Sequence, residues 1–198
     1  MTVLRAFVLT FISMAIVAEL AFADSQSIPA GWFMAGSAPQ LYTAGVDPNT
    51  NHDKAKSAYL ASTQAEGTQF GTLMQMFSAQ DYLGKRVSLS AYIKSAEVAR
   101  RAALWMRVDG QGAKRLSFDN MADRPILGTT DWKEYTIVLD VPPESRDIAL
   151  GVLLSGQGKV WVSGISLKSV SQMQPKTGVE YILPTQPQNL NFTHLGQK

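Results

Sequence analysis

The sequence contains no cysteine and only two histidines, and these absences remove several kinds of chemistry at once. Without cysteine there are no disulfides, no thiolate metal ligands and no cysteine nucleophile. His52 and His194 lie far apart in the chain, which disfavours a transition-metal site. Neither G-x-S-x-G nor H-E-x-x-H occurs. We therefore expect a protein that is not an enzyme; a carboxylate pair of the glycosidase type, which spacing does not reveal, is the enzymatic alternative.

Charge is also scarce. Charged residues make up 17% of the 198 residues, the formal net charge is +2, and no long basic run occurs. Nucleic-acid-binding proteins usually carry a basic stripe, and no helix-turn-helix segment is recognisable, so we expect no nucleic-acid partner. The hydrophobic fraction of 45% is enough for one domain with a core and appendages.

The N-terminus has the pattern of an export signal. Arg5 gives a positive start, an apolar stretch runs to Ala18, and Ala21-Phe22-Ala23 is an A-x-A cleavage site. This predicts a signal peptide over residues 1–23 and a periplasmic or secreted protein that is not held at the membrane after cleavage. A retained membrane anchor is the alternative, but Glu19 and the cleavage site argue against it.

Short apolar stretches alternate with turn residues from 25 to 170, with almost no helical periodicity. This pattern is typical of an all-β sandwich. Near its end, Val160 and Val162 are in one strand phase and Ile165 and Leu167 in the other, so we predict a β-bulge at Ser163-Gly164. Residues 171–198 are rich in Pro, Gln and Asn, which predicts an extended C-terminal tail that lies along the sandwich or is left loose.

One stretch, residues 102–109, has two different faces at the two-residue strand period. One face is apolar throughout, and the other carries Trp105, Arg107 and Asp109. A ring, a guanidinium and a carboxylate in one row can stack on a ligand and hydrogen-bond its polar edge. We add Gln75 and Tyr92 as further ligand-binding candidates. The alternative is that a loop covers Trp105 and that Arg107 pairs with Asp109.

A polar stretch before this region resembles the first half of a calcium loop. Oxygen-bearing side chains occur at alternate positions, namely Asp47, Asn49, Asn51 and Asp53. However, His52 stands where the loop needs glycine, and Ala58 stands where it needs glutamate. A solvated turn fits better, so we expect no cofactor, with a structural calcium ion as the alternative.

The order of several short motifs resembles a known bacterial domain. They are F-G-T-L-M-Q, G-K-R-V-S-L-S-A-Y-I-K-S, L-W-M-R-V-D, F-D-N-M-A-D-R-P-I-L-G-T-T-D-W and L-L-S-G-Q-G-K-V-W-V, between Gly31 and Leu167. That domain is found alone in secreted proteins and appended to helix-turn-helix transcription regulators, and is similar to the galactose-binding-like carbohydrate-binding modules. The resemblance implies a two-sheet jelly-roll sandwich.

The chain departs from this resemblance in two places. Such modules usually end V-W-V-D-D-V, but here Ser163 and Gly164 replace the two acids. Many also begin with an N-x-x-F-E strand, which is missing here, whereas Asn189-Leu190-Asn191-Phe192 lies near the C-terminus. We hypothesise that the tail supplies a similar edge strand.

Together these features predict an exported, non-catalytic, carbohydrate-binding-like module. Trp105 would stack on a sugar, the polar candidates would bind its hydroxyls, and the partner would be a glycan or a component of the cell envelope. A structural or protein-interaction domain of the envelope, with Trp161 and the tail as contacts, is the alternative. A hydrolase is the least favoured function.

Overall fold

A computed structural model describes residues 27–65 and 67–178, and within these ranges the regular structure is almost entirely β-strand. The strands are β1 (Phe33–Gly36), β2 (Tyr42–His52), β3 (Ala55–Ser62), β4 (Phe70–Ser78), β5 (Arg86–Asp109), β6 (Arg115–Asp119), β7 (Ile126–Asp140), β8 (Asp147–Ser155) and β9 (Lys159–Val170). Three short 3₁₀ turns link them, η1 (Pro39–Leu41), η2 (Gln80–Tyr82) and η3 (Gln111–Ala113). In the described ranges, no helix has the length and apolarity needed to cross a membrane.

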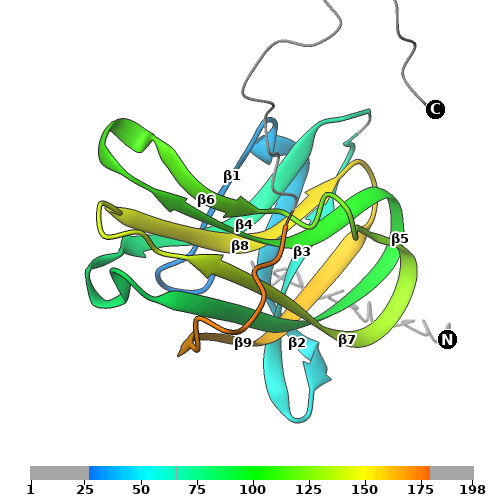
Figure 1. Cartoon of the computed structure of the whole chain (residues 1–198). Helices are drawn as coiled ribbons and strands as arrows, with labels where there is room; N and C mark the ends of the chain where they lie inside the picture. Colours follow the sequence, from blue (N-terminus) through cyan, green and yellow to red (C-terminus); the bar gives the residue numbers. More distant parts are fainter. Residues whose placement is uncertain (1–26, 66, 179–198) are drawn as a thin grey trace, which may run out of the picture.

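The strands form one curled antiparallel sheet that folds back on itself, consistent with the predicted sandwich (Figure 1). Hydrogen bonding follows the order β1-β4-β8-β5-β9-β3-β2, and β6 and β7 both pair with β5. We call β1, β4, β8, β6 and the second half of β5 the first layer. The second layer consists of β2, β3, β9, β7 and the first half of β5. The predicted signal peptide at 1–23 and the possible edge strand at 189–192 lie outside the described residues.

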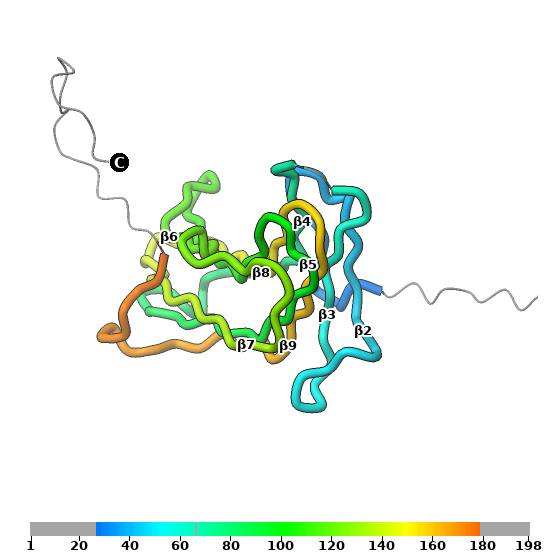
Figure 2. The backbone as a smooth tube through the Cα atoms, turned by 90° about the vertical axis from the view of Figure 1, so that its right-hand side faces the viewer, coloured from blue at the N-terminus to red at the C-terminus, as the bar shows by residue number. Residues whose placement is uncertain are grey.

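β5 is the strand that joins the two layers. Residues 86–96 of β5 pair with β9, and residues 101–109 pair with β8. Figure 2 shows the two layers from the side, with β5 at the point where they join. The sequence predicts a polar connector at 97–101, but the strand continues through it. Three register shifts against β7, with Glu97 in the left-handed region (φ 52°), let the strand bend without ending.

The core lies between the layers and follows the predicted alternation. In the first half of β5, the side chains of Val87, Leu89, Ala91 and Ile93 are fully buried. In the second half, Leu104, Met106 and Val108 are buried in the same cluster. Burying both apolar rows of one strand supplies much of the hydrophobic stabilisation that a cysteine-free sandwich needs.

The polar stretch that resembles a calcium loop is the end of a β-hairpin. β2 pairs with β3 up to its last residue, with a register shift between Asp47 and Asn51. The Asp47 carboxylate accepts hydrogen bonds from the backbone N–H groups of Asn49 and Thr50 at 2.9 and 3.1 Å. These side-chain hydrogen bonds satisfy backbone N–H groups at the irregular end of the hairpin. They allow Asp and Asn, which are uncommon in strands, to remain in β2.

The predicted β-bulge is present in β9. The register between β5 and β9 shifts where Tyr92 pairs with Ser163, and Gly164 has φ +60°. A glycine adopts this backbone angle readily, whereas other residues rarely do. Ser163 and Gly164 stand where the resembling modules have two acids. They form the bulge at which the side-chain alternation of β9 changes phase.

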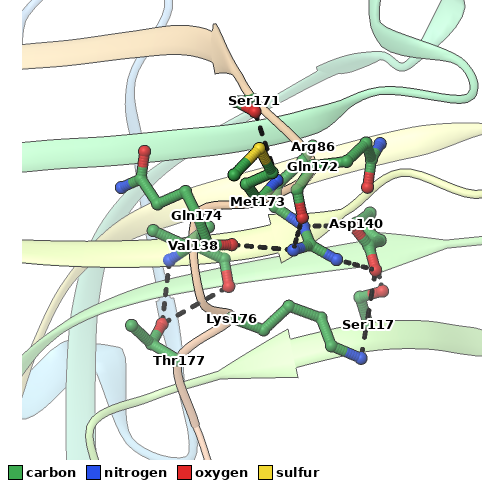
Figure 3. Close-up of polar contacts among 10 residues, drawn as sticks. All are labelled: Arg86, Ser117, Val138, Asp140, Ser171, Gln172, Met173, Gln174, Lys176 and Thr177. Atoms are coloured by element: carbon green, nitrogen blue, oxygen red, sulfur yellow. Dashed lines mark hydrogen bonds and ion pairs between the residues drawn. The ribbon is translucent and has the colours of Figure 1, made fainter.

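Residues 171–178, which we call the C-terminal strap, lie against Arg86 of β5 and against Val138 and Asp140 of β7 (Figure 3). Arg86 donates to the carbonyl oxygens of Gln172 and Gln174, and its guanidinium also makes a bidentate pair with Asp140. Thr177 donates its N–H to the carbonyl of Val138 at 2.9 Å. These contacts hold residues 171–178 against the sandwich.

Candidate functional site

Three of the five predicted binding residues, Trp105, Arg107 and Asp109, share one face of the first layer, which is opposite to the face of the buried Leu104, Met106 and Val108. Strand pairing aligns residues of β4, β8 and β5 in rows across this outer face. One row contains Phe70, Ser155 and Arg101, and another contains Met74, Gly151 and Trp105. Arg107 and Asp109 belong to the following rows. The alternation read from the sequence thus assigns this face correctly.

Trp105 is packed into this face rather than open to solvent. Its side chain is only 7% exposed, and its indole N–H donates to the Thr72 hydroxyl at 2.8 Å. That hydroxyl in turn donates to the carbonyl of Val152 at 2.8 Å. Trp105 pairs with Gly151 of β8, where a Cβ would clash with the backbone of Leu73 and Met74 in β4. The predicted open stacking platform is therefore not what the structure contains.

Arg107 and Asp109 form an ion pair with each other. The Arg107 Nε lies 2.7 Å from the Asp109 carboxylate, and the two side chains are 40% and 6% exposed. Both line a cleft of about 1130 Å³ between the ends of β4, β5, β6 and β8. Within the described residues, the Oγ of Ser145 is buried in this region without a hydrogen-bond partner. The sequence analysis gives this pairing of Arg107 with Asp109 as the alternative to ligand binding.

The remaining two candidates lie elsewhere. Gln75 aligns with Leu150 and Met106, which places it on the core-facing side of the first layer. It lines a separate cleft of about 440 Å³ with Trp32. Tyr92 belongs to the second layer. The five predicted residues therefore do not form one site. Gln75 lies on the opposite side of the first layer from Trp105, and the bend in β5 puts Tyr92 in the second layer.

Tyr92 belongs to an aromatic cluster on the outer face of the second layer. Its ring stacks on His52 at 4.0 Å between centroids, and His52 also lies against Trp132 at 5.2 Å. His52 reaches this position because the β2–β3 hairpin continues to its last residue. These ring contacts join the end of the β2–β3 hairpin to β5 and β7 and stabilise the hairpin there.

Asp47 is used by the protein itself rather than left available as a metal ligand. Its carboxylate accepts from the Trp161 indole N–H at 2.7 Å and lies 3.4 Å from the Lys159 ammonium. Burial opposes ionisation of Asp47, but these hydrogen bonds and the Lys159 charge outweigh it and lower the pKa to about 2. Over residues 27–65 and 67–178, the structure holds no group of three or more His, Asp or Glu suited to a metal ion.

Arg101 was missed by the sequence analysis and lies on the same face as Trp105. It lines a cleft of about 360 Å³, which we call the Arg101 cleft, with Thr68, Phe70, Arg100, Asn120, Leu153 and Ser155. The signal was available, because Arg101 continues the alternation of Ala103, Trp105 and Arg107. The sequence predicts a polar connector that ends at Arg101, whereas β5 runs through this residue.

Comparison with solved structures shows what class of fold this is. The chain is similar to the enzymatically active domain of tailspike protein 4 of bacteriophage CBA120, with a TM-score of 0.55 and 14% identity over 73% of this chain and 20% of that one. It is also similar to the CBM22-1 xylan-binding domain of Xyn10C from Paenibacillus barcinonensis, with a TM-score of 0.52 and 12% identity over 74% and 90% of the two chains. At such low identities, the likeness establishes a shared β-sandwich fold.

Comparison by sequence gives a more specific relative. The chain is 44% identical over 171 residues to the "Uncharacterized HTH-type transcriptional regulator YbfP" of Bacillus subtilis strain 168. The match covers 85% of this chain and 58% of the relative, so the chain spans little more than half of that protein's length. No protein-family model matches the chain.

This relative corrects the functional prediction made from the sequence. An exported carbohydrate-binding module, with an envelope domain or a hydrolase as alternatives, was expected. A relative at 44% identity is instead named a transcriptional regulator, and the chain covers 58% of that relative's length. The expectation that nucleic acid plays no part loses support for the same reason. The similarity in fold to carbohydrate-binding modules is retained.

Proposed function

We propose that this sandwich is a non-catalytic, effector-sensing domain of a transcription-regulation system. The observation that carries this proposal is the 44% identity to a chain named as a transcriptional regulator. At this level of identity over 171 residues, the two chains are expected to share one fold across the matched segment.

The sandwich corresponds, we infer, to a part of the relative that does not contact DNA. A helix-turn-helix needs two helices joined by a short turn. In residues 27–65 and 67–178, by contrast, only 3₁₀ turns of three residues interrupt the strands. A β-sandwich in a regulator suits ligand recognition, since its outer faces and loop ends form clefts on a rigid scaffold.

The outer face of the first layer is the region that best suits an effector. The Arg101 cleft and the cleft of Arg107 lie toward opposite ends of β5 residues 101–109. Between them Trp105 and Thr72 make a buried, hydrogen-bonded contact that fixes β4 against β5. A ligand in either cleft would contact strands held rigidly by this pair, which is the preorganisation that a sensor requires.

A comparison of transcripts tests the proposal. The strain lacking this chain is compared with strains complemented by the wild-type chain, by Arg101→Gln and by Lys168→Ala, with and without added sugar acids. We expect a limited group of genes to respond in the wild type, to lose that response in the deletion and the Arg101→Gln strain, and to regain it with Lys168→Ala, because Lys168 is exposed and lies outside both clefts. Identical transcripts in all strains would refute the regulatory role.

A further inference from the structure

The Arg101 cleft differs from the other clefts in its charge. Its lining residues include two arginines, Arg100 and Arg101, and no acidic residue, whereas the cleft of Gln75 has one cation, Lys56, and no acidic residue. The cleft of Arg107, in contrast, contains Asp109, Glu144 and Asp147 beside its cations. An excess of positive charge in a confined space attracts and binds anions.

Arg101 has no acidic partner in the part of the chain that the structure describes. Arg107 pairs with Asp109, Arg86 with Asp140, and Arg124 with Asp119, as the ion pairs at 2.6–2.7 Å show. The hydrogen bond that Arg101 makes there runs from Nη2 to the carbonyl oxygen of Asn120 at 3.0 Å.

The Nε–H of Arg101 is buried and has no hydrogen-bond partner among the described residues. A guanidinium remains charged at any physiological pH, so burying it without a counter-charge costs free energy. The same burial lowers the pKa of Arg101. Proteins rarely leave such a donor unsatisfied, and a ligand that is present only part of the time is one reason for doing so.

The remaining walls of the cleft indicate what the anion is attached to. Phe70 and Leu153 provide apolar surface, and Thr68, Asn120 and Ser155 provide hydroxyl and amide groups. The Ser155 hydroxyl donates to the carbonyl of Gln69 at 3.1 Å, which leaves its lone pairs as acceptors. A ring beside hydroxyl and amide groups suits a sugar, which has both apolar C–H faces and hydroxyl edges.

We propose that the Arg101 cleft binds the oxyanion of a charged sugar, with Arg101 as the principal ligand and Arg100 as the second. The oxyanion is a carboxylate, as in a sugar acid, or a phosphate, as in a sugar phosphate. This inference rests on the proposed function, because it names the chemical class of the effector. Binding would neutralise the charge of Arg101, so the occupied protein is more stable than the free one.

Binding is tested on the purified full chain by calorimetry and by following the Arg side-chain Nε–H signals in nuclear magnetic resonance spectra. The probes are glucuronate, galacturonate, glucose 6-phosphate, inorganic phosphate, acetate and neutral glucose. We expect at least one anionic sugar to bind about tenfold or more tightly than glucose and to shift the Arg101 Nε–H signal. A preference for the sugar acids or for the sugar phosphate decides between carboxylate and phosphate.

Two variants of equal charge change provide the control. Arg101→Gln is expected to weaken anion binding by about 10- to 100-fold. Arg146→Gln removes an exposed arginine in the other cleft, and its affinity is expected to stay within about twofold of the wild type. Because Arg101→Gln removes an uncompensated buried charge, the free variant should melt at or above the wild-type temperature, which separates lost binding from misfolding.

Three results would overturn the proposal. They are equal binding of glucose and the charged sugars, unchanged affinity in Arg101→Gln, and no shift of the Arg101 signal with any anion. None of them depends on transcription, so the regulatory role can fail while this cleft still binds an anion, and the reverse also holds.

Discussion

At the scale of single residues, the structure uses its most conspicuous polar and aromatic side chains to satisfy one another. The Trp105 indole donates to Thr72, and the Trp161 indole donates to Asp47. Each contact joins two strands that are distant in sequence. Residue type alone indicates that a tryptophan and a nearby acceptor are capable of such contacts, but only the fold determines which partner is chosen.

Trp105→Ala should reduce the free energy of unfolding by about 3–5 kcal/mol, because a large buried ring is removed and the Thr72 hydroxyl loses a partner. The measurement is urea denaturation followed by circular dichroism. Trp132→Ala is the control, since that ring is only partly buried on the second layer and its loss should cost about 1 kcal/mol. Equal losses for both variants would mean that Trp105 is not buried as described.

Asp47 predicts a dependence of stability on acid. Because the folded state holds the Asp47 pKa at about 2, below its ordinary 3.8, the unfolded chain takes up this proton first as the pH falls. The contribution of Asp47 is therefore complete above about pH 4 and is lost toward pH 2, by roughly 2 kcal/mol at most. Asp47→Asn should be less stable at pH 7 and lose less between pH 4 and 2, as measured by chemical denaturation at each pH.

The matched control for this pH series is Asp53→Asn, in the same hairpin. The Asp53 side chain is 91% exposed, so its loss should leave both the stability at pH 7 and the acid dependence close to those of the wild type. If Asp47→Asn showed the wild-type acid dependence, the proposed network around Asp47 would be wrong.

At the scale of elements, alternation made most strands predictable, and bends in strands caused the errors. The apolar rows of β5 were identified correctly on both sides of its bend. Its continuity was not, because Glu97 and its polar neighbours are what a connector contains. Such residues do not end a strand when a neighbouring strand bends with them and keeps its hydrogen bonds on both sides of the bend. Here β7 follows it, pairing with Ser95, Val98 and Ala102 in turn.

The bulge in β9 was predictable because a change of strand phase is visible in the order of apolar residues. Gly164→Ala should destabilise the protein by about 1–2 kcal/mol, because φ +60° is unfavourable for alanine and the new Cβ would lie 3.3 Å from the Tyr92 ring. Gly112→Ala shares a similar backbone angle, φ +64°, with nothing within 4 Å. The difference between their unfolding free energies measures the crowding at Tyr92, and a smaller loss for Gly164→Ala would contradict it.

At the scale of the whole molecule, the fold class was predictable and the candidate site was predictable only in part. Strand alternation gave the outer face that carries Trp105 and Arg107. It could not give the depth at which Trp105 is packed, because that depends on its pairing with Thr72 of β4 and Gly151 of β8. Nor could it show that Gln75 and Tyr92 face elsewhere, since those assignments depend on the pairing register.

The predicted signal peptide at residues 1–23 can be tested through the N-terminus of the protein in its host. If residues 1–23 direct export, the mature chain begins at Asp24, and intact-mass measurement of the protein from its native host should find that N-terminus. Ala23→Arg, which destroys the A-x-A site, should then accumulate with its full N-terminus, whereas Ser25→Arg beyond the site should be processed. A chain that begins at Met1 in the cytoplasm would contradict export.

The continuity of β5 makes the sandwich a single mechanical unit. A force that separates β8 from residues 101–109 is transmitted along an unbroken backbone to residues 86–96. These residues are hydrogen-bonded to β7 and β9. The two layers therefore lack independent rupture points, and a pulled molecule should open in one step rather than two.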